Sequence, residues 1–115
     1  MELSNAQIEC LKAHCEGVAH AVEGGVPCLV LRGLRLPTGA SPAFVDALLR
    51  LGDRGDGYVT RLLLSERAVG ASKIALNWNA ENIRMVERNW QGYSWKAPIE
   101  LPLEEILREH LKAFV

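Results

Sequence analysis

Residues 28–36 constrain the fold of this chain more than any other segment. They read Cys-Leu-Val-Leu-Arg-Gly-Leu-Arg-Leu, which is rich in the branched residues that strands favour. The leucines before Gly33 share one phase of a strand, and the leucines after it share the other. A bulge at Gly33 would return all of them to one face. The segment therefore predicts a bulged strand that is buried on one side.

Helical signals stand at both ends of the chain. Ser4 and Gln7 have the spacing of a capping box. The apolar residues that follow at helical spacing are Ile8, Leu11, Cys15, Val18 and Val22, and Gly24-Gly25 would end this first helix. Near the C-terminus, Pro102 suits a first helical position, and the apolar face consists of Leu103, Ile106, Leu107, Leu111 and Phe114.

The middle of the chain reads as strands separated by turns. Residues 41–52 carry helix-capping signals but also alternate as a strand does, and we interpret 43–51 as a strand. Residues 52–57 are a tight Gly-rich loop. Further strands are predicted at 58–66 and 73–78, residues 83–87 are compatible with a short return strand, and residues 88–99 look irregular. The predicted fold is a single α+β domain, 1–115, with an N-terminal helix, an antiparallel meander of three to four strands, and a C-terminal helix.

Composition excludes several classes of function. The formal net charge is -1, from 13 Lys and Arg against 14 Asp and Glu, and no basic stripe marks a nucleic-acid binder. No apolar run approaches the ~20 residues of a membrane span, so no membrane partner is expected. The first residues lack the pattern of a secretory signal, which predicts a cytoplasmic protein.

The candidate chemical sites are all weak. Cys10 and His14 are four residues apart, but a zinc site needs a third ligand and the chain offers no second pair. Asp53 and Asp56 lie in the Gly-rich loop without the alternation of a calcium loop, which favours a solvated turn. Cys15 and Cys28 fall on apolar segments and read as buried thiols. We therefore expect no metal, no cofactor and no catalytic residue.

Aromatic residues gather near the end of the predicted strands. All three tryptophans and one tyrosine lie within residues 78–95, and the segment Trp90-Gln-Gly-Tyr93-Ser-Trp95 is the most distinctive in the chain. Such a cluster either completes a core or forms a protein-binding surface. We predict that one of Trp90 and Trp95 packs against the sheet and the closing helix as core, and that the other is partly exposed on a contact surface with Tyr93 and Arg88.

Three landmarks resemble bacterial members of the ubiquitin-conjugating-enzyme superfamily. They are Arg32-Gly-Leu-Arg-Leu-Pro-x-Gly39, Asp46-Ala-Leu-Leu-Arg-Leu51 and Gly55-Asp-Gly-Tyr58. The segment from Trp90 to Trp95 and the closing helix are similar to the C-terminal part of that family. The resemblance implies a fold that begins with a helix, continues in a four-strand antiparallel meander and ends helically, and it supports the strand at 43–51.

The chain departs from the family where catalysis would occur. No cysteine follows Cys28, Val59 replaces the proline of the family's Gly-Tyr-Pro turn, and no His-Pro-Asn is present. The resemblance thus implies a non-catalytic, partner-binding variant, whose partner is a ubiquitin-like modifier or its activating or conjugating machinery. The alternative is a stand-alone α+β interaction or structural protein, unrelated to conjugation. The sequence leaves self-association open.

Overall fold

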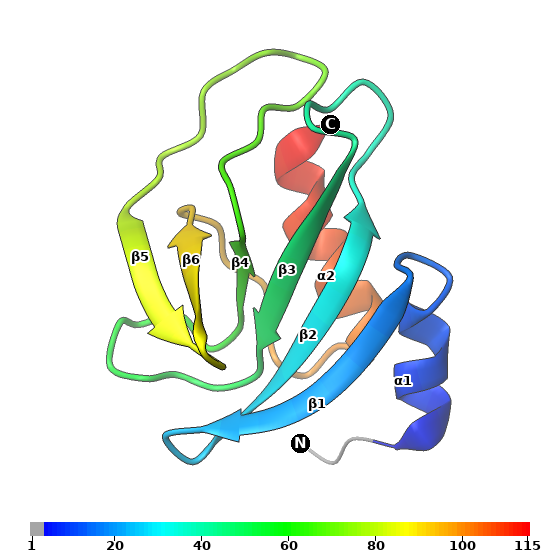
Figure 1. Cartoon of the computed structure of the whole chain (residues 1–115), viewed down its shortest axis with the longest axis vertical. Helices are drawn as coiled ribbons and strands as arrows, with labels where there is room; N and C mark the ends of the chain where they lie inside the picture. The colour runs from blue at the N-terminus through cyan, green and yellow to red at the C-terminus, as the bar shows by residue number, and fades with distance from the viewer. Residues whose placement is uncertain (1–3) are drawn as a thin grey trace.

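The computed structural model describes residues 4–115 and shows an α+β architecture in which α2 lies behind an antiparallel sheet and α1 stands beside the edge strand β1, against the start of α2 (Figure 1). The order of elements confirms the predicted α+β class. The elements are α1 (Asn5–Leu11), β1 (Gly17–Glu23), β2 (Val26–Arg35), β3 (Phe44–Arg50), β4 (Arg61–Leu64), β5 (Ala80–Met85), β6 (Arg88–Gly92), α2 (Leu103–Leu111) and a 3-10 turn, η1 (Lys112–Phe114).

The sheet has six strands in the order β1-β2-β3-β4-β6-β5, and every neighbouring pair is antiparallel. The predicted bulge is confirmed, because the pairing of β2 with β3 shifts between Leu31 and Leu34 and Gly33 has a φ of 61°. The shift returns Leu34 to the face that Leu29 and Leu31 occupy, where all three are buried. The strand predicted at 43–51 is confirmed as β3.

The prediction of one long first helix is wrong beyond Leu11, where α1 ends. Ser4 does cap α1, since its hydroxyl accepts a hydrogen bond from the Gln7 N–H at 3.1 Å. Residues 17–23 instead form β1, and Gly24-Gly25 make the turn of a hairpin with β2, both at positive φ. Val18 and Val22 are four residues apart, a spacing that fits one face of a helix and one face of a strand equally.

Two other predictions differ from the structure. Residues 73–78 form no strand, although Leu76 and Trp78 pack against the core from the loop that they occupy. Residues 88–92, predicted irregular, form β6 between β4 and β5. Together with β1, this strand brings the sheet to six, more than the three to four predicted. The strand predicted at 58–66 is present as β4, which is shorter than predicted. The strand at 83–87 corresponds to β5, which begins and ends earlier in the chain.

The face of the sheet that the helices cover holds the main core. Alternate residues of β2, β3 and β4 point to this face and contact the apolar side of α2, as expected for strands half covered by helices. The helix predicted at the C-terminus is confirmed, and its buried residues are Leu103, Ile106, Leu107, His110 and Leu111. No helix among residues 4–115 combines the length and the apolar character that crossing a bilayer requires.

The opposite face, here called the open face, has a smaller core of its own. It consists of Cys28, Leu48, Leu63, Met85 and Trp90. The tip of the β5–β6 hairpin is fastened to the first hairpin, because the Val86 N–H donates to the Glu23 carboxylate at 2.8 Å. Val86 is held at a φ of 49°, an unfavourable value for a β-branched residue. The sheet therefore curls around this second core.

Candidate functional site

Strand β3 divides the open face into three zones. Its side chains on this face are, in order, Phe44, Asp46, Leu48 and Arg50, since residues two apart in a strand share a face. Phe44 and Asp46 line a groove, Leu48 belongs to the second core, and Arg50 belongs to a buried ionic cluster. The groove is the zone that solvent and a partner can reach.

The groove consists of two adjoining hollows of about 580 Å³ and 170 Å³. Both hollows are lined by Glu16, Gly33 and Phe44. The larger one continues over Asp46, Ser65, Glu66 and Arg88, and the smaller one continues over Ala13, His14, Cys15 and Arg35. The groove therefore runs from the loop after α1, across the bulge in β2, to the start of β6.

The Gly33 bulge shapes the floor of the groove. Its N–H donates to Asp46 Oδ1 at 2.9 Å, and a side chain at position 33 would collide with Glu16. Arg88 Nη1 donates to Asp46 Oδ2 at 3.0 Å, while its guanidinium lies 4.8 Å from the centre of the Trp90 ring. The Gly33 N–H, and secondly Arg88, hold the pKa of Asp46 below its usual range. Asp46 and Arg88 therefore form an ion pair whose two charges cancel.

The rim of the groove is apolar and acidic. Phe44 is 60% exposed, which is unusual for a large aromatic side chain in a monomer. Glu16 and Glu66 are exposed and form no ion pair within residues 4–115. The groove therefore presents one aromatic anchor between free carboxylates, which suits a partner with apolar and basic side chains.

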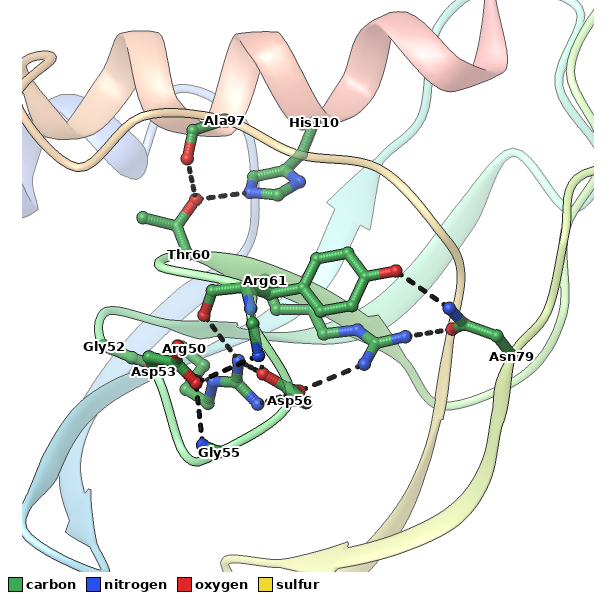
Figure 2. Close-up of polar contacts among 12 residues, drawn as sticks. Arg50, Gly52, Asp53, Gly55, Asp56, Thr60, Arg61, Asn79, Ala97 and His110 are labelled. Atoms are coloured by element: carbon green, nitrogen blue, oxygen red, sulfur yellow. Dashed lines mark hydrogen bonds and ion pairs between the residues drawn. The ribbon is translucent and has the colours of Figure 1, made fainter.

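The ionic cluster at the far end of β3 consists of two arginines and an aspartate that bond mainly to one another (Figure 2), and Arg61 Nε is its one buried nitrogen without a partner among the described residues. Arg50 and Arg61 lie directly opposite each other on neighbouring strands, and each is only 3% exposed. The Asp56 carboxylate offsets the repulsion between the two guanidinium groups. It accepts hydrogen bonds from both Nη atoms of Arg50 at 2.8 Å and from Nη1 of Arg61 at 3.1 Å. The Arg50 contacts, first of all, hold the pKa of Asp56 well below its usual range.

Tyr58 joins this cluster to the segment after β6. Its hydroxyl donates to Ser94 Oγ at 3.1 Å and accepts from Asn79 Nδ2 at 2.8 Å, and the Asn79 carbonyl accepts from Arg61. The hydrogen bonds to Ser94 and then Asn79 lower the pKa of Tyr58. Because the Nη atoms of both arginines are bonded within the cluster and Arg61 Nε is buried, we interpret the cluster as a clasp that closes the loop 51–60, and not as a binding site.

His110 lies on the helix-covered side of the same region. The Thr60 hydroxyl donates to the Ala97 carbonyl at 2.7 Å, so the His110 Nε2–H is the donor in its 2.9 Å contact with Thr60 Oγ1 (Figure 2). The Nδ1 lone pair then has no partner among the described residues. Burial lowers the pKa of His110 to about 4, and the ring is neutral.

The four predicted contact residues are separated by the structure. Trp90 is buried in the second core, and its indole N–H donates to the Met85 carbonyl at 2.9 Å. Trp95 is half-buried, so the two tryptophans differ in burial as predicted, but it is Trp95 and not the buried Trp90 that packs against the main core and α2. Tyr93 is 1% exposed, and its hydroxyl donates to the His110 carbonyl. Its predicted partial exposure is wrong, because its ring fits edge-on between Trp78 and Phe114. Only Arg88 of the four lines the groove.

The residues that the sequence offered as candidate metal ligands or reactive thiols do not form a site in the structure. His14 bonds to Glu104 of α2 at 2.8 Å, and Cys10 is exposed on α1. Within residues 4–115, no three His, Cys, Asp or Glu side chains gather as metal ligands. Asp53 accepts the N–H groups of Gly55 and Gly57, as expected of a turn. Cys28 is completely buried, and burial raises the pKa of its thiol.

Sequence reasoning missed Phe44 and Asp46 as groove residues. The signal was available, since an aromatic residue and a carboxylate alternate with buried residues in the predicted strand. The pairing of Asp46 with Arg88 was not visible, because it depends on how β6 enters the sheet. No protein-family model, curated protein or solved structure matches the chain.

Proposed function

We propose that this chain is a non-catalytic protein-binding domain whose binding surface is the groove on the open face. The single observation that carries the proposal is the exposed Phe44 at the junction of the two hollows. Aromatic side chains that are exposed beside a concave surface are typical anchors of protein interfaces. Arg88 contributes at the other end of the groove, where Trp90 supports its guanidinium from below.

The partner we propose is a ubiquitin-like modifier or its activating or conjugating machinery. This part rests on the resemblance to ubiquitin-conjugating enzymes. It is supported by a helix, four successive antiparallel strands and a closing helix in that order. The Leu-Pro-x-Gly landmark follows β2, Asp46 lies in β3, and the Gly-Tyr landmark precedes β4, as the family's pattern implies. In chain order β5 and β6 follow the fourth strand, which is where the resemblance would put the catalytic loop of an active family member.

The absence of catalysis is proposed from the state of the thiols. The Cys28 sulfur is buried and contacts the Val26 carbonyl, so neither an attacking thiolate nor an incoming modifier has access to it. The Cys15 thiol is half-buried, and burial raises its pKa as well. A domain of this kind holds a modifier or enzyme without forming a bond to it.

A thioester assay tests this claim. The chain is incubated with ATP, a ubiquitin-like modifier from the same organism and its activating enzyme, and the products are separated with and without reducing agent. We expect no adduct that reducing agent releases. Such an adduct, lost on Cys28→Ser, would overturn the non-catalytic function, and Cys10→Ser controls for modification of the exposed thiol.

The second candidate is an interaction or structural protein unrelated to conjugation. One observation favours it, namely that β1 leaves a sheet edge without a partner among the described residues. This candidate keeps the groove as a binding surface and changes only the class of partner. Binding of the modifier, or of its enzymes, separates the two.

A further inference from the structure

In the part of the chain that the structure describes, strand β1 forms one edge of the sheet and pairs only with β2. No backbone hydrogen bond joins residues 17–23 to any other segment of the chain within residues 4–115. α1 packs against α2 and supplies Leu11 to the main core; it stands beside the start of β1 (Figure 1), while Ala19, His20 and Val22 further along the strand are exposed. The outer side of β1 is therefore open to another strand.

The register identifies which backbone groups of β1 face outward. The Pro27 carbonyl accepts from the Leu51 N–H of the segment after β3, so the backbone groups of Pro27 face β3. By alternation, Cys28, Val30 and Arg32 face β1, where their partners are Ala21, Ala19 and Gly17. The N–H and C=O groups that point away from the sheet then belong to Val18, His20 and Val22.

The two edges of the sheet differ in their protection. Edge strands are commonly guarded by charged residues, proline or a bulge. Strand β5 has Glu81, Arg84 and an irregularity between Ala80 and Ile83. Strand β1 reads Gly-Val-Ala-His-Ala-Val-Glu, without Lys, Arg, Pro or a bulge, and the carboxylate of its Glu23 is already bonded to the Val86 N–H. Val22 at the same edge is 64% exposed.

We propose that β1 pairs with β1 of a second copy of this chain, antiparallel about a two-fold axis through His20. In this register Val18 lies opposite Val22 of the partner subunit, and His20 lies opposite itself. Among two-fold pairings, this register lets the outward N–H and C=O groups of Val18, His20 and Val22 all form hydrogen bonds with the second strand. The valines meet on one face, which covers the exposed Val22, and the small residues Ala19 and Ala21 meet on the other.

Charge supports the same register. Glu23 comes to lie opposite Gly17 of the partner subunit. The guanidinium of Arg32 lies over Gly17 in the same subunit, since a Cβ on Gly17 would be 2.6 Å from its Nη2. Arg32 forms no ion pair within residues 4–115. Because the Val86 N–H uses only Oε1 of Glu23, each end of the paired strands brings the other oxygen, Oε2, to a free guanidinium, and the two sheets become one continuous sheet.

Sedimentation equilibrium of the purified chain over a range of concentrations tests the pairing. We expect a reversible dimer, and at least a tenfold weaker dimerisation for Val22→Lys, because an ammonium must then be buried against Val18 of the partner subunit. Ile74→Lys makes the same change at a loop residue that is 71% exposed, and should leave the dimer intact. A monomer at all concentrations, or equal effects of the two variants, would overturn the proposal.

Amide hydrogen exchange reports the register directly. The amides of Val18, His20 and Val22 should gain protection as the protein concentration rises, whereas those of Ala19 and Ala21 should be protected by β2 at every concentration. His20→Pro removes an outward N–H without touching the β1–β2 ladder, so it should give a folded monomer. Concentration-independent exchange at all five positions would contradict the pairing.

Discussion

At the scale of single residues, His110 shows how burial sets a protonation state. Its imidazole is completely buried and bonded through Nε2 to Thr60, and Nδ1 has no partner within residues 4–115. Protonation would place a charge and an unsatisfied donor inside the main core, which is why burial lowers the pKa of His110 to about 4. The folded chain therefore prefers the neutral ring.

This preference predicts a pH dependence of stability. The unfolded chain takes up the His110 proton near pH 6.5 and the folded chain only near pH 4, so the contribution is complete above pH 6.5 and is lost as the pH falls from 6.5 to 4. The loss should total about 3 kcal/mol, at about 1.4 kcal/mol per pH unit. Urea unfolding measured across this range checks it. A slope in His110→Gln equal to that of the wild type would contradict it.

The two tryptophans of the aromatic segment should behave differently when they are truncated. Trp90→Ala empties a fully buried site in the second core and should cost ~3–5 kcal/mol of unfolding free energy. Trp95→Ala removes a half-buried ring and its 2.7 Å bond to the Glu109 carbonyl, and should cost about 1–2 kcal/mol. Thermal and urea melts of the two variants measure the difference. Equal losses would show that the ring of Trp95 is as important to the core as that of Trp90.

At the scale of elements, the loop 51–60 depends on the Asp56 clasp. Asp56→Asn leaves two nearly buried guanidinium groups without a counter-charge, so unfolding free energy should fall by ~3–5 kcal/mol. Asp53→Asn is the matched control, because Asp53 is exposed and bonds only to backbone N–H groups of its own loop. Urea unfolding at pH 7 compares them. Similar small losses in both variants would mean that the clasp contributes little.

The elements also show where local sequence determines structure. Residues 28–36 are predictable because branched residues, phase and the Gly33 bulge agree. Residues 17–25 are not, because Val18 and Val22 fit both periods, and a Gly-Gly pair serves a helix end as well as a hairpin turn. Pairing with β2 decides between them, and that contact is not local. The same holds for residues 73–78, which alternate as a strand does but have no strand to pair with.

In the candidate site, too, features set by residue type could be predicted, and features set by non-local contacts could not. The charged Arg88 and the partial exposure of one tryptophan could be predicted from residue type. The burial of Tyr93 between Trp78 and Phe114, and the bridging of Arg50 and Arg61 by Asp56, depend on which strands become neighbours. The groove itself exists because a bulge, a loop and the start of β6 meet on one face.

At the scale of the whole molecule, the two faces and the edge of the sheet have separate roles in this account. The helix-covered face holds the main core, and the open face holds a small core between a clasp and a groove. In the proposed function the groove binds a protein partner, and in the proposed dimer the β1 edge joins two copies. Because the groove and the edge involve different residues, a variant at one should leave the other unchanged.

Isothermal titration calorimetry with the ubiquitin-like modifier, and separately with its activating and conjugating enzymes, tests the central claim. The wild-type chain should bind at least one of them. Phe44→Ala should weaken that binding by about 2 kcal/mol if the ring is the anchor of the groove, whereas Ile74→Ala, at an equally exposed loop position, should bind as the wild type does. Equal affinities of the two variants, or no binding to any of the three proteins, would contradict the account.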